Sequence, residues 1–393
     1  MIINKKLILA ALIIVVAIEG AALISRNSPA SLEVYADKAI EACKDAGYRP
    51  SCYDKEIPKF TDKLSMEDAF RVTGIVQDKD PSYQYCHVLG HELSAREVRK
   101  NPDDWKNVIA RCPSGMCSNG CLHGGFQEKF RAEYLTPEEI PAIKRDLIDL
   151  CEAREGWNPT GLEQASCYHA LGHLTMYITN ADIPQAIKIC DETSFKPDGR
   201  DLRQLCYDGV FMQMFQPLEP EDFALVEGKQ PTREEVPAFC AAYEGHKQAS
   251  CFSESWPLFQ NDLMNPKNVT GFCEMTEAAY RGRCYNAVFY VMTTRLGFDV
   301  DTLSAYCQEL PADIRETCFA NAASRMIETD YRNVKKSADL CRKAAEFGAE
   351  ERCFKELLQY STFNFHVGSE AFFNLCNSLP EPWQSQCLSK TTR

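Results

Sequence analysis

The sequence has no excess of positive charge and no block of basic residues. Lys and Arg number 43 against 56 Asp and Glu, for a formal net charge of −13. Proteins that bind nucleic acid need basic clusters to neutralise phosphates, so this composition argues against that class. The chain also lacks a phosphate-binding glycine loop, a dinucleotide-binding glycine motif, a nucleophile elbow and a Cys-x-x-Cys-His haem attachment motif.

A long apolar run is found only at the N-terminus. Lys5 and Lys6 precede an almost uninterrupted apolar stretch over 7–24. This pattern predicts an export signal or membrane anchor over residues 1–26. Cleavage after Ala22 would remove the segment, whereas an uncleaved segment is long enough to anchor the chain in a membrane. In both cases we expect the remaining chain to lie outside the cytoplasm, in a periplasm, on a cell surface or secreted.

Cysteine, by contrast, is abundant. The chain has 20 cysteines, a number typical of compartments in which disulfides persist. In the C-terminal half they form pairs separated by ten or eleven residues, and the second cysteines recur every 33 to 35 residues. This periodicity indicates an internal repeat. The expected pairs are Cys240–Cys251, Cys273–Cys284, Cys307–Cys318, Cys341–Cys353 and Cys376–Cys387.

Helical patterns flank each cysteine pair. Asp301 can cap a helix that ends near Cys307, and apolar residues at helical spacing follow Cys318. Each unit is therefore two helices joined by a disulfide, which contributes about 2–3 kcal/mol. In repeat length and helix count the unit resembles the tetratricopeptide and Sel1-type class. That resemblance implies an α-solenoid, so we expect an all-α chain of tandem helical hairpins stapled by disulfides within each repeat.

The same pattern extends toward the N-terminus with longer connections. It predicts the pairs Cys43–Cys52, Cys112–Cys121, Cys151–Cys167 and Cys190–Cys206, and leaves Cys86 to pair with Cys117. An alternative for Cys112, Cys117 and Cys121 is a metal site together with His123. We expect repeats with the histidines over 30–240 and regular repeats over 241–393. The acidic, proline-containing stretch 216–235 is the best candidate for a long loop or lid.

Five of the seven histidines fall between residues 87 and 173. His87 and His91 form one His-x-Leu-Gly-His motif, and His169 and His173 form another. Residues four apart share a helix face, so each pair could present two imidazoles to one ion. His123 lies between the two motifs in the sequence, at the position of the first histidine.

Alignment of the units places the histidines in one register. One position holds His87, His123, His169 and Asp208 in four successive units, and the position one turn later holds His91, Gln127, His173 and Met212. In the later units the first position holds Ser253, Asn286, Ala320 and Lys355. Residues that can bind metal are therefore confined to one contiguous block of repeats.

Glycines accompany these histidines, notably Gly90, Gly124, Gly172 and Gly209. Glycine inside a helix costs about 1 kcal/mol relative to alanine. We therefore expect a close approach at these positions, by a neighbouring helix or by a ligand, and helix packing is the simpler explanation.

These patterns predict a transition-metal site. Its candidate ligands are His87, His91, His123, His169, His173 and Asp208, with Glu92 and Glu128 as candidate catalytic residues. Many histidines with a carboxylate favour iron or copper, although zinc also fits. The alternatives are structural, hydrogen-bonded histidines and a metal-free catalytic or pH-sensing role.

Three classes of function agree with these features. The first is a metal-dependent enzyme of the cell envelope, with redox chemistry favoured. The second is a solenoid scaffold that binds envelope proteins, attached to the membrane if its N-terminal segment is uncleaved. The third is a metal storage or delivery protein, for which Met176, Met212 and Met214 would suit copper.

Overall fold

The computed structural model describes residues 29–130, 136 and 138–392. These residues form helices joined by short connections, and the described part of the chain has two isolated β-bridges but no strand. The expected all-α fold is confirmed. The expected export segment over 1–26 lies outside the described residues. Within the described ranges, no helix is both long enough and apolar enough to cross a membrane.

The chain forms two compact units, the first ending at Leu89 and the second running from Gly90 to Arg393. The sequence predicts a boundary near residue 240 between the repeats with the histidines and the regular repeats. Residues on both sides of that boundary belong to the second unit. The first unit contains the helices α2 (Pro29–Cys43), α3 (Arg49–Glu56), η1 (Ile57–Asp62) and α4 (Met66–Lys79). Helix α2 packs on α3 and α4, and Leu32, Tyr53 and Phe70 are buried in the core of this unit.

The second unit begins within α5 (His87–Lys100), a helix that is continuous across the division, and we describe it here. Its principal helices are α7 (Gly120–Phe130), α9 (Gly161–Ile178), α11 (Arg203–Phe215), α14 (Gly245–Glu254), α17 (Arg281–Arg295), α19 (Ala312–Thr329) and α21 (Glu350–Asn364). Shorter helices alternate with them: α6 (Trp105–Ala110), α8 (Ile140–Asp149), α10 (Ile183–Thr193), α12 (Pro220–Val226), α13 (Val236–Cys240), α15 (Gln260–Leu263), α16 (Val269–Cys273), α18 (Val300–Gln308), α20 (Val334–Ala344), α22 (Glu370–Ser378) and α23 (Trp383–Leu388). The 3₁₀ turns are η2 (Pro102–Asp104), η3 (Cys117–Asn119), η4 (Trp256–Phe259), η5 (Pro266–Asn268), η6 (Ala278–Tyr280), η7 (Tyr331–Asn333), η8 (Ala345–Phe347) and η9 (Ser389–Thr392).

Disulfides join the end of one helix to the start of the next. Nine pairs have Cα–Cα distances of 5.3 to 5.7 Å: Cys43–Cys52, Cys112–Cys121, Cys151–Cys167, Cys190–Cys206, Cys240–Cys251, Cys273–Cys284, Cys307–Cys318, Cys341–Cys353 and Cys376–Cys387. These are nine of the ten pairs expected from the spacing. Cys86 and Cys117 are also disulfide-bonded, and no cysteine of the described chain is free. A thiolate metal site at Cys112, Cys117 and Cys121 is thereby excluded, because the metal ligand is the thiolate.

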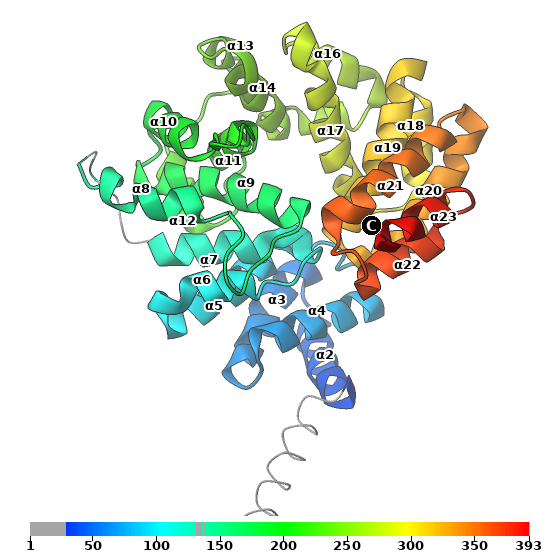
Figure 1. Ribbon diagram of the computed structural model, residues 1–393, viewed down its shortest axis with the longest axis horizontal. Coiled ribbons are helices and arrows are strands. Elements are labelled where there is room, and N and C mark those ends of the chain that lie inside the picture. Colours follow the sequence, from blue (N-terminus) through cyan, green and yellow to red (C-terminus); the bar gives the residue numbers. More distant parts are fainter. Residues whose placement is uncertain (1–28, 131–135, 137, 393) are drawn as a thin grey trace, which may run out of the picture. The chain divides into compact units, whose positions relative to one another are not determined.

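The principal helices of the second unit contact one another in sequence order. Helix α7 contacts α9, α9 contacts α11, and the series continues through α14, α17 and α19 to α21 (Figure 1). The series then returns to its beginning, because α21 contacts α9 and α19 contacts η3. The backbone amide of Tyr331 also donates to the carbonyl of Gly115 at 3.0 Å. The expected open stack has two free ends, whereas the contacts of this unit close on themselves.

Glycines permit the closest helix approaches. A Cβ atom at Gly124 in α7 would overlap the backbone carbonyl of His91 in α5. A Cβ atom at Gly209 in α11 would likewise overlap the carbonyl of His169 in α9. The glycines are therefore helix-packing positions. Because they let these backbones touch, histidine side chains on adjacent helices come close together.

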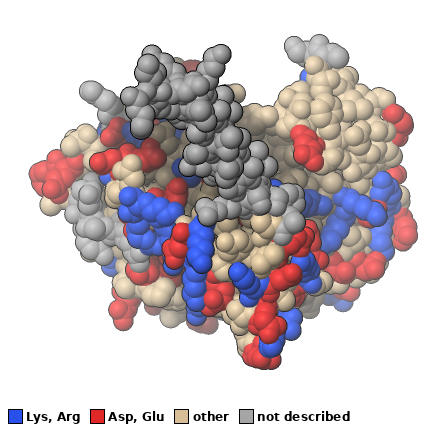
Figure 2. All heavy atoms as spheres, turned by 90° about the horizontal axis from the view of Figure 1, so that it is seen from below, with Lys and Arg blue, Asp and Glu red and all other residues tan. Residues whose placement is uncertain are grey.

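Charged side chains of both signs occupy the face of the molecule shown in Figure 2. On the face shown in Figure 2, Lys and Arg side chains are intermixed with Asp and Glu side chains over the described residues. A mixed surface of this kind does not define a partner.

Candidate metal centre

Three buried histidines form the first group. His87 and His91 lie one turn apart on α5, and His123 lies on α7. One nitrogen from each of the three side chains can be chosen so that all lie within 4.8 Å of one another. The three residues are only 3%, 4% and 6% exposed. Three imidazoles at about 2.0 Å from one ion have nitrogens about 3.3 Å apart, so a small side-chain adjustment would let this group hold a metal ion.

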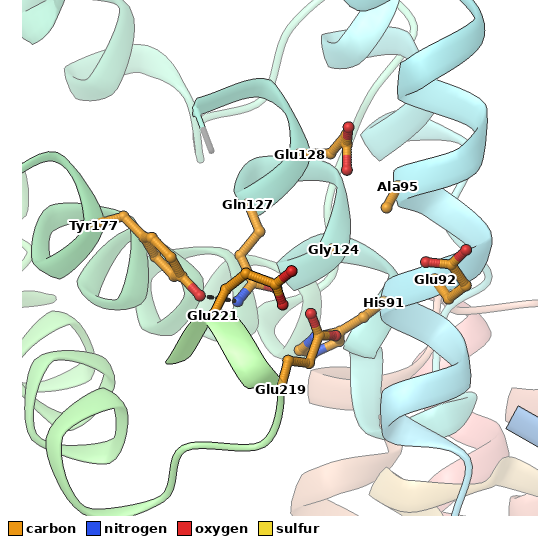
Figure 3. Close-up of a pocket in the computed structure, with 9 residues that line it drawn as sticks. All are labelled: His91, Glu92, Ala95, Gly124, Gln127, Glu128, Tyr177, Glu219 and Glu221. Carbon is orange, nitrogen blue, oxygen red and sulfur yellow. Dashed lines mark hydrogen bonds and ion pairs between the residues drawn. The ribbon is translucent and has the colours of Figure 1, made fainter. Parts of the chain in front are cut away.

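Glu219 lies beside this group. Its Oε1 is 3.4 Å from Nδ1 of His91 (Figure 3). A carboxylate that accepts the second N–H of a ligand histidine fixes the orientation of the ring and raises its basicity. Glu219 immediately precedes α12 and forms a capping box with Asp222. The sequence predicts a loop or lid over 216–235 without indicating a role for Glu219, although Glu-Pro-Glu-Asp at 219–222 is a recognisable helix start.

The second histidine pair belongs to α9 and contacts α11. Nδ1 of His173 lies 2.6 Å from Oε1 of Gln213, whose amide Nε2 donates to Asp222 at 2.9 Å. Because Asp222 takes the amide N–H, the oxygen of Gln213 faces His173, and Nδ1 of His173 carries the proton. The lone pair of His173 Nε2 is then directed at Nε2 of His169, 3.1 Å away. His169 Nε2 also lies 3.2 Å from Sδ of Met212.

His123 connects the two groups. Its ring centroid lies 5.4 Å from that of His91, 5.5 Å from that of His169 and 5.1 Å from that of His173. Four histidines from three successive helices thus form one continuous cluster. These histidines hold equivalent or adjacent-turn positions in the register of the sequence, and their rings lie next to one another.

The second pair is electrically neutral at pH 7. Burial lowers the pKa of His169 well below its ordinary value of 6.5, and the charges of His173 and Arg283 act in the same direction. Burial also lowers the pKa of His173 to about 4, against the hydrogen bond to Gln213. Neutral imidazole is the form that binds metal.

Asp222 supports the second histidine pair, His169 and His173, through Gln213. Burial would raise the pKa of Asp222, but hydrogen bonds from Tyr177, Gln213 and the backbone amides of Leu218 and Glu219 hold that pKa below its usual 3.8. The carboxylate is therefore ionised at neutral pH. It fixes Gln213, and Gln213 in turn fixes the tautomer of the histidine beyond it.

Asp208 shares the register position but has other contacts. Its Oδ1 accepts hydrogen bonds from Ser250 at 2.7 Å and Gln204 at 3.0 Å, and its Oδ2 forms an ion pair with Arg283. The carboxylate is buried, with 5% exposure. Arg283 neutralises the charge that would otherwise attract a cation. The role of Asp208 as a metal ligand stays a prediction, and from α11 it is Met212 that contacts His169.

The two candidate catalytic glutamates form ion pairs. Glu92 pairs with Arg96 at 2.9 Å and with Arg99 at 3.0 Å, and Glu128 pairs with Arg99 at 2.9 Å. Both side chains line the pocket described below, and their catalytic role stays a prediction.

A small acidic pocket adjoins His91 (Figure 3). Its walls include the carboxylates of Glu92, Glu128, Glu219 and Glu221, and its volume is about 30 Å³. That volume accommodates one or two water molecules. The carboxylate of Glu219 would attract a cation toward His91, and water in the pocket could complete the coordination of an ion bound there.

These features define a disulfide-rich, all-helical protein with a buried histidine cluster that could bind a metal ion. No protein-family model, no curated protein and no solved structure matches this chain. The disulfides indicate an oxidising, extracytoplasmic environment.

Proposed function

We propose that this protein is an extracytoplasmic metalloenzyme in which His87, His91 and His123 bind one transition-metal ion. The convergence of three buried imidazole side chains from two helices is the observation that carries the proposal. Disulfides already staple the helices, so a metal ion is not needed to hold this part of the chain together. A functional ion explains better why the histidines are confined to neighbouring repeats.

The surroundings of the three histidines favour catalysis over a purely structural ion. Three protein ligands leave a coordination position for water or a small substrate. The pocket beside His91 is large enough for water or a diatomic molecule, and Glu219 at 3.4 Å from the ring can accept a proton. A ligand set rich in imidazole favours iron or copper and redox chemistry, while zinc and hydrolysis remain the second choice.

A second candidate is metal storage or delivery. It is favoured by the thioether of Met212, which lies 3.2 Å from His169 next to the first histidine group. A delivery protein would release its ion readily to a chelator or partner, whereas an enzyme would retain it through many turnovers.

Metal analysis by mass spectrometry tests the proposal. The protein would be purified without a histidine tag from an oxidising compartment, as wild type and as His123→Leu. This substitution removes the ligand nitrogen and puts an apolar side chain of similar size in its place. His246→Ala, which changes an exposed histidine in α14, is the matched control. We expect iron, copper or zinc in wild type and in His246→Ala, and about one equivalent less in His123→Leu.

The opposite result is equally clear. If wild type and His123→Leu fold alike and neither holds metal, even after reconstitution with each of the three ions, the metalloenzyme proposal is wrong. The remaining function would then be a scaffold for envelope proteins.

A further inference from the structure

We infer that His169, His173 and Met212 form a second metal site, distinct from the three-histidine group, that selects the soft monovalent ion Cu(I). The inference does not depend on the first group being occupied, because its ligand atoms come from a different pair of helices, α9 and α11.

The donor atoms are already near the spacing that coordination requires. Nε2 of His169 lies 3.1 Å from Nε2 of His173 and 3.2 Å from Sδ of Met212. With metal distances of about 2.0 Å to nitrogen and about 2.3 Å to sulfur, these separations correspond to ligand–metal–ligand angles of roughly 95–100°. The two separations from His169 therefore match those expected for ligands of one ion.

The helices hold these atoms in place through the backbone. A Cβ at Gly172 in α9 would overlap the carbonyl of Cys206 in α11, and a Cβ at Gly209 would overlap that of His169. The two backbones are thus in direct contact at His169 and at Gly172, within the stretch that carries the histidine pair. This contact sets Met212, which follows Gly209 by one turn, against His169.

Hydrogen bonds to residues around the site orient His173 for metal binding. The ionised Asp222 accepts the amide N–H of Gln213 at 2.9 Å, and the oxygen of Gln213 accepts the Nδ1–H of His173 at 2.6 Å. This leaves the lone pair of His173 Nε2 pointing at the site. A carboxylate relayed to the remote nitrogen of a histidine is the usual support of a metal ligand. Gln213 and Asp222 are buried, with 2% and 3% exposure, so this support is built into the core.

The chemistry of the donors selects the ion. A thioether is a soft ligand that prefers Cu(I), while magnesium, calcium and manganese prefer oxygen donors. All three donors are uncharged, and a monovalent ion leaves far less uncompensated charge in a partly buried site than a divalent ion does. The first group differs, because Glu219 lies beside His91 and suits a divalent ion. Each group therefore matches an ion of different charge and softness.

The site is also reachable from solvent. His173 is buried, but His169 and Met212 are partly exposed. Two of the three donor residues are therefore in contact with solvent.

X-ray absorption spectroscopy tests the inference on the intact, disulfide-bonded protein. Cu(I) would be supplied anaerobically as its acetonitrile complex, so that no reductant attacks the disulfides. We expect a sulfur scatterer at about 2.3 Å in wild type and none in Met212→Leu. Every cysteine is in a disulfide, so the sulfur signal reports a methionine. Met214→Leu changes a buried methionine two residues along α11, on another face, and should leave the spectrum unchanged.

Chelator competition supplies the second readout. Met212→Leu should weaken Cu(I) binding at least tenfold and leave Zn(II) binding unaltered, whereas His91→Leu should weaken Zn(II) binding and leave the Cu(I) sulfur signal in place. The inference is overturned if Met212→Leu keeps the wild-type Cu(I) affinity and sulfur scatterer while remaining folded by circular dichroism. A failure of the three-histidine site alone would appear as absent Zn(II) binding with intact Cu(I) binding.

Discussion

Replacing Gly124 with alanine should reveal whether helix contact controls the histidine cluster. The added Cβ would overlap three backbone atoms of His91: the carbonyl oxygen, the carbonyl carbon and the Cα. Backbone atoms cannot rotate away as a side chain can. To restore ordinary van der Waals contact, α7 would have to move from α5 by on the order of 1 Å.

The magnitude follows from two opposing contributions. Overpacking of a tight interface costs about 1–3 kcal/mol, and the better helix propensity of alanine returns up to about 1 kcal/mol. We expect a net loss of roughly 1–2 kcal/mol in unfolding free energy. The shift also exceeds the ~0.2 Å tolerance of metal–ligand distances several-fold, so metal affinity at His91 and His123 should fall more than tenfold.

The assay is urea unfolding together with chelator competition for bound metal. Gly282→Ala is the matched control, because no atom lies within 4 Å of a Cβ added at that position in α17. It should be neutral or stabilising by up to about 1 kcal/mol, with unchanged metal binding. If Gly124→Ala behaves like Gly282→Ala in both measurements, the argument that glycine contacts position the histidines is refuted.

Two further predictions concern a buried acid and a disulfide. Burial raises the pKa of Glu254 to about 8, above the ordinary value of 4.5, against a hydrogen bond from Gln216. The native state then keeps a proton that the unfolded state releases, so this contribution to stability is complete below pH 4.5 and is lost as the pH rises toward 8. Glu254→Gln should remove this pH dependence, by at most ~1.4 kcal/mol per pH unit, in urea unfolding between pH 5 and 8, and an unchanged slope would contradict the assignment. Replacing Cys112 and Cys121 with serine should cost about 2–3 kcal/mol and also reduce metal content, because the bond fixes the start of α7 two residues before His123. Replacing Cys376 and Cys387 should cost a similar amount with metal content retained, and equal metal loss in both variants would show only a general loss of folding.

The features predicted correctly from the sequence are those encoded by local spacing. The cysteine pairs enclose short loops, so their separation alone indicates which helix ends they join. The histidine register depends on the helical period and on the repeat, and both can be read along the chain.

Contacts between distant residues could not be predicted in this way. The ion pair of Asp208 with Arg283 joins residues 75 positions apart, and it gives the carboxylate a partner that the register does not reveal. The position of Glu219 beside His91 likewise depends on how the segment before α12 folds back. Periodicity defines which face a side chain occupies, but a partner supplied by a loop or a remote repeat depends on tertiary packing.

The contact between α21 and α9 has a consequence for how this protein can evolve. An open array can gain or lose whole repeats, since each repeat touches only its neighbours. Here an added or deleted helix pair between α11 and α21 would change the distance between α21 and α9 and would disrupt their contact. Helices α14, α17, α19 and α21, which carry Ser253, Asn286, Ala320 and Lys355, complete the series of contacts from α11 back to α9. The contact of α21 with α9, the helix that carries His169 and His173, therefore limits how many helices can lie between them.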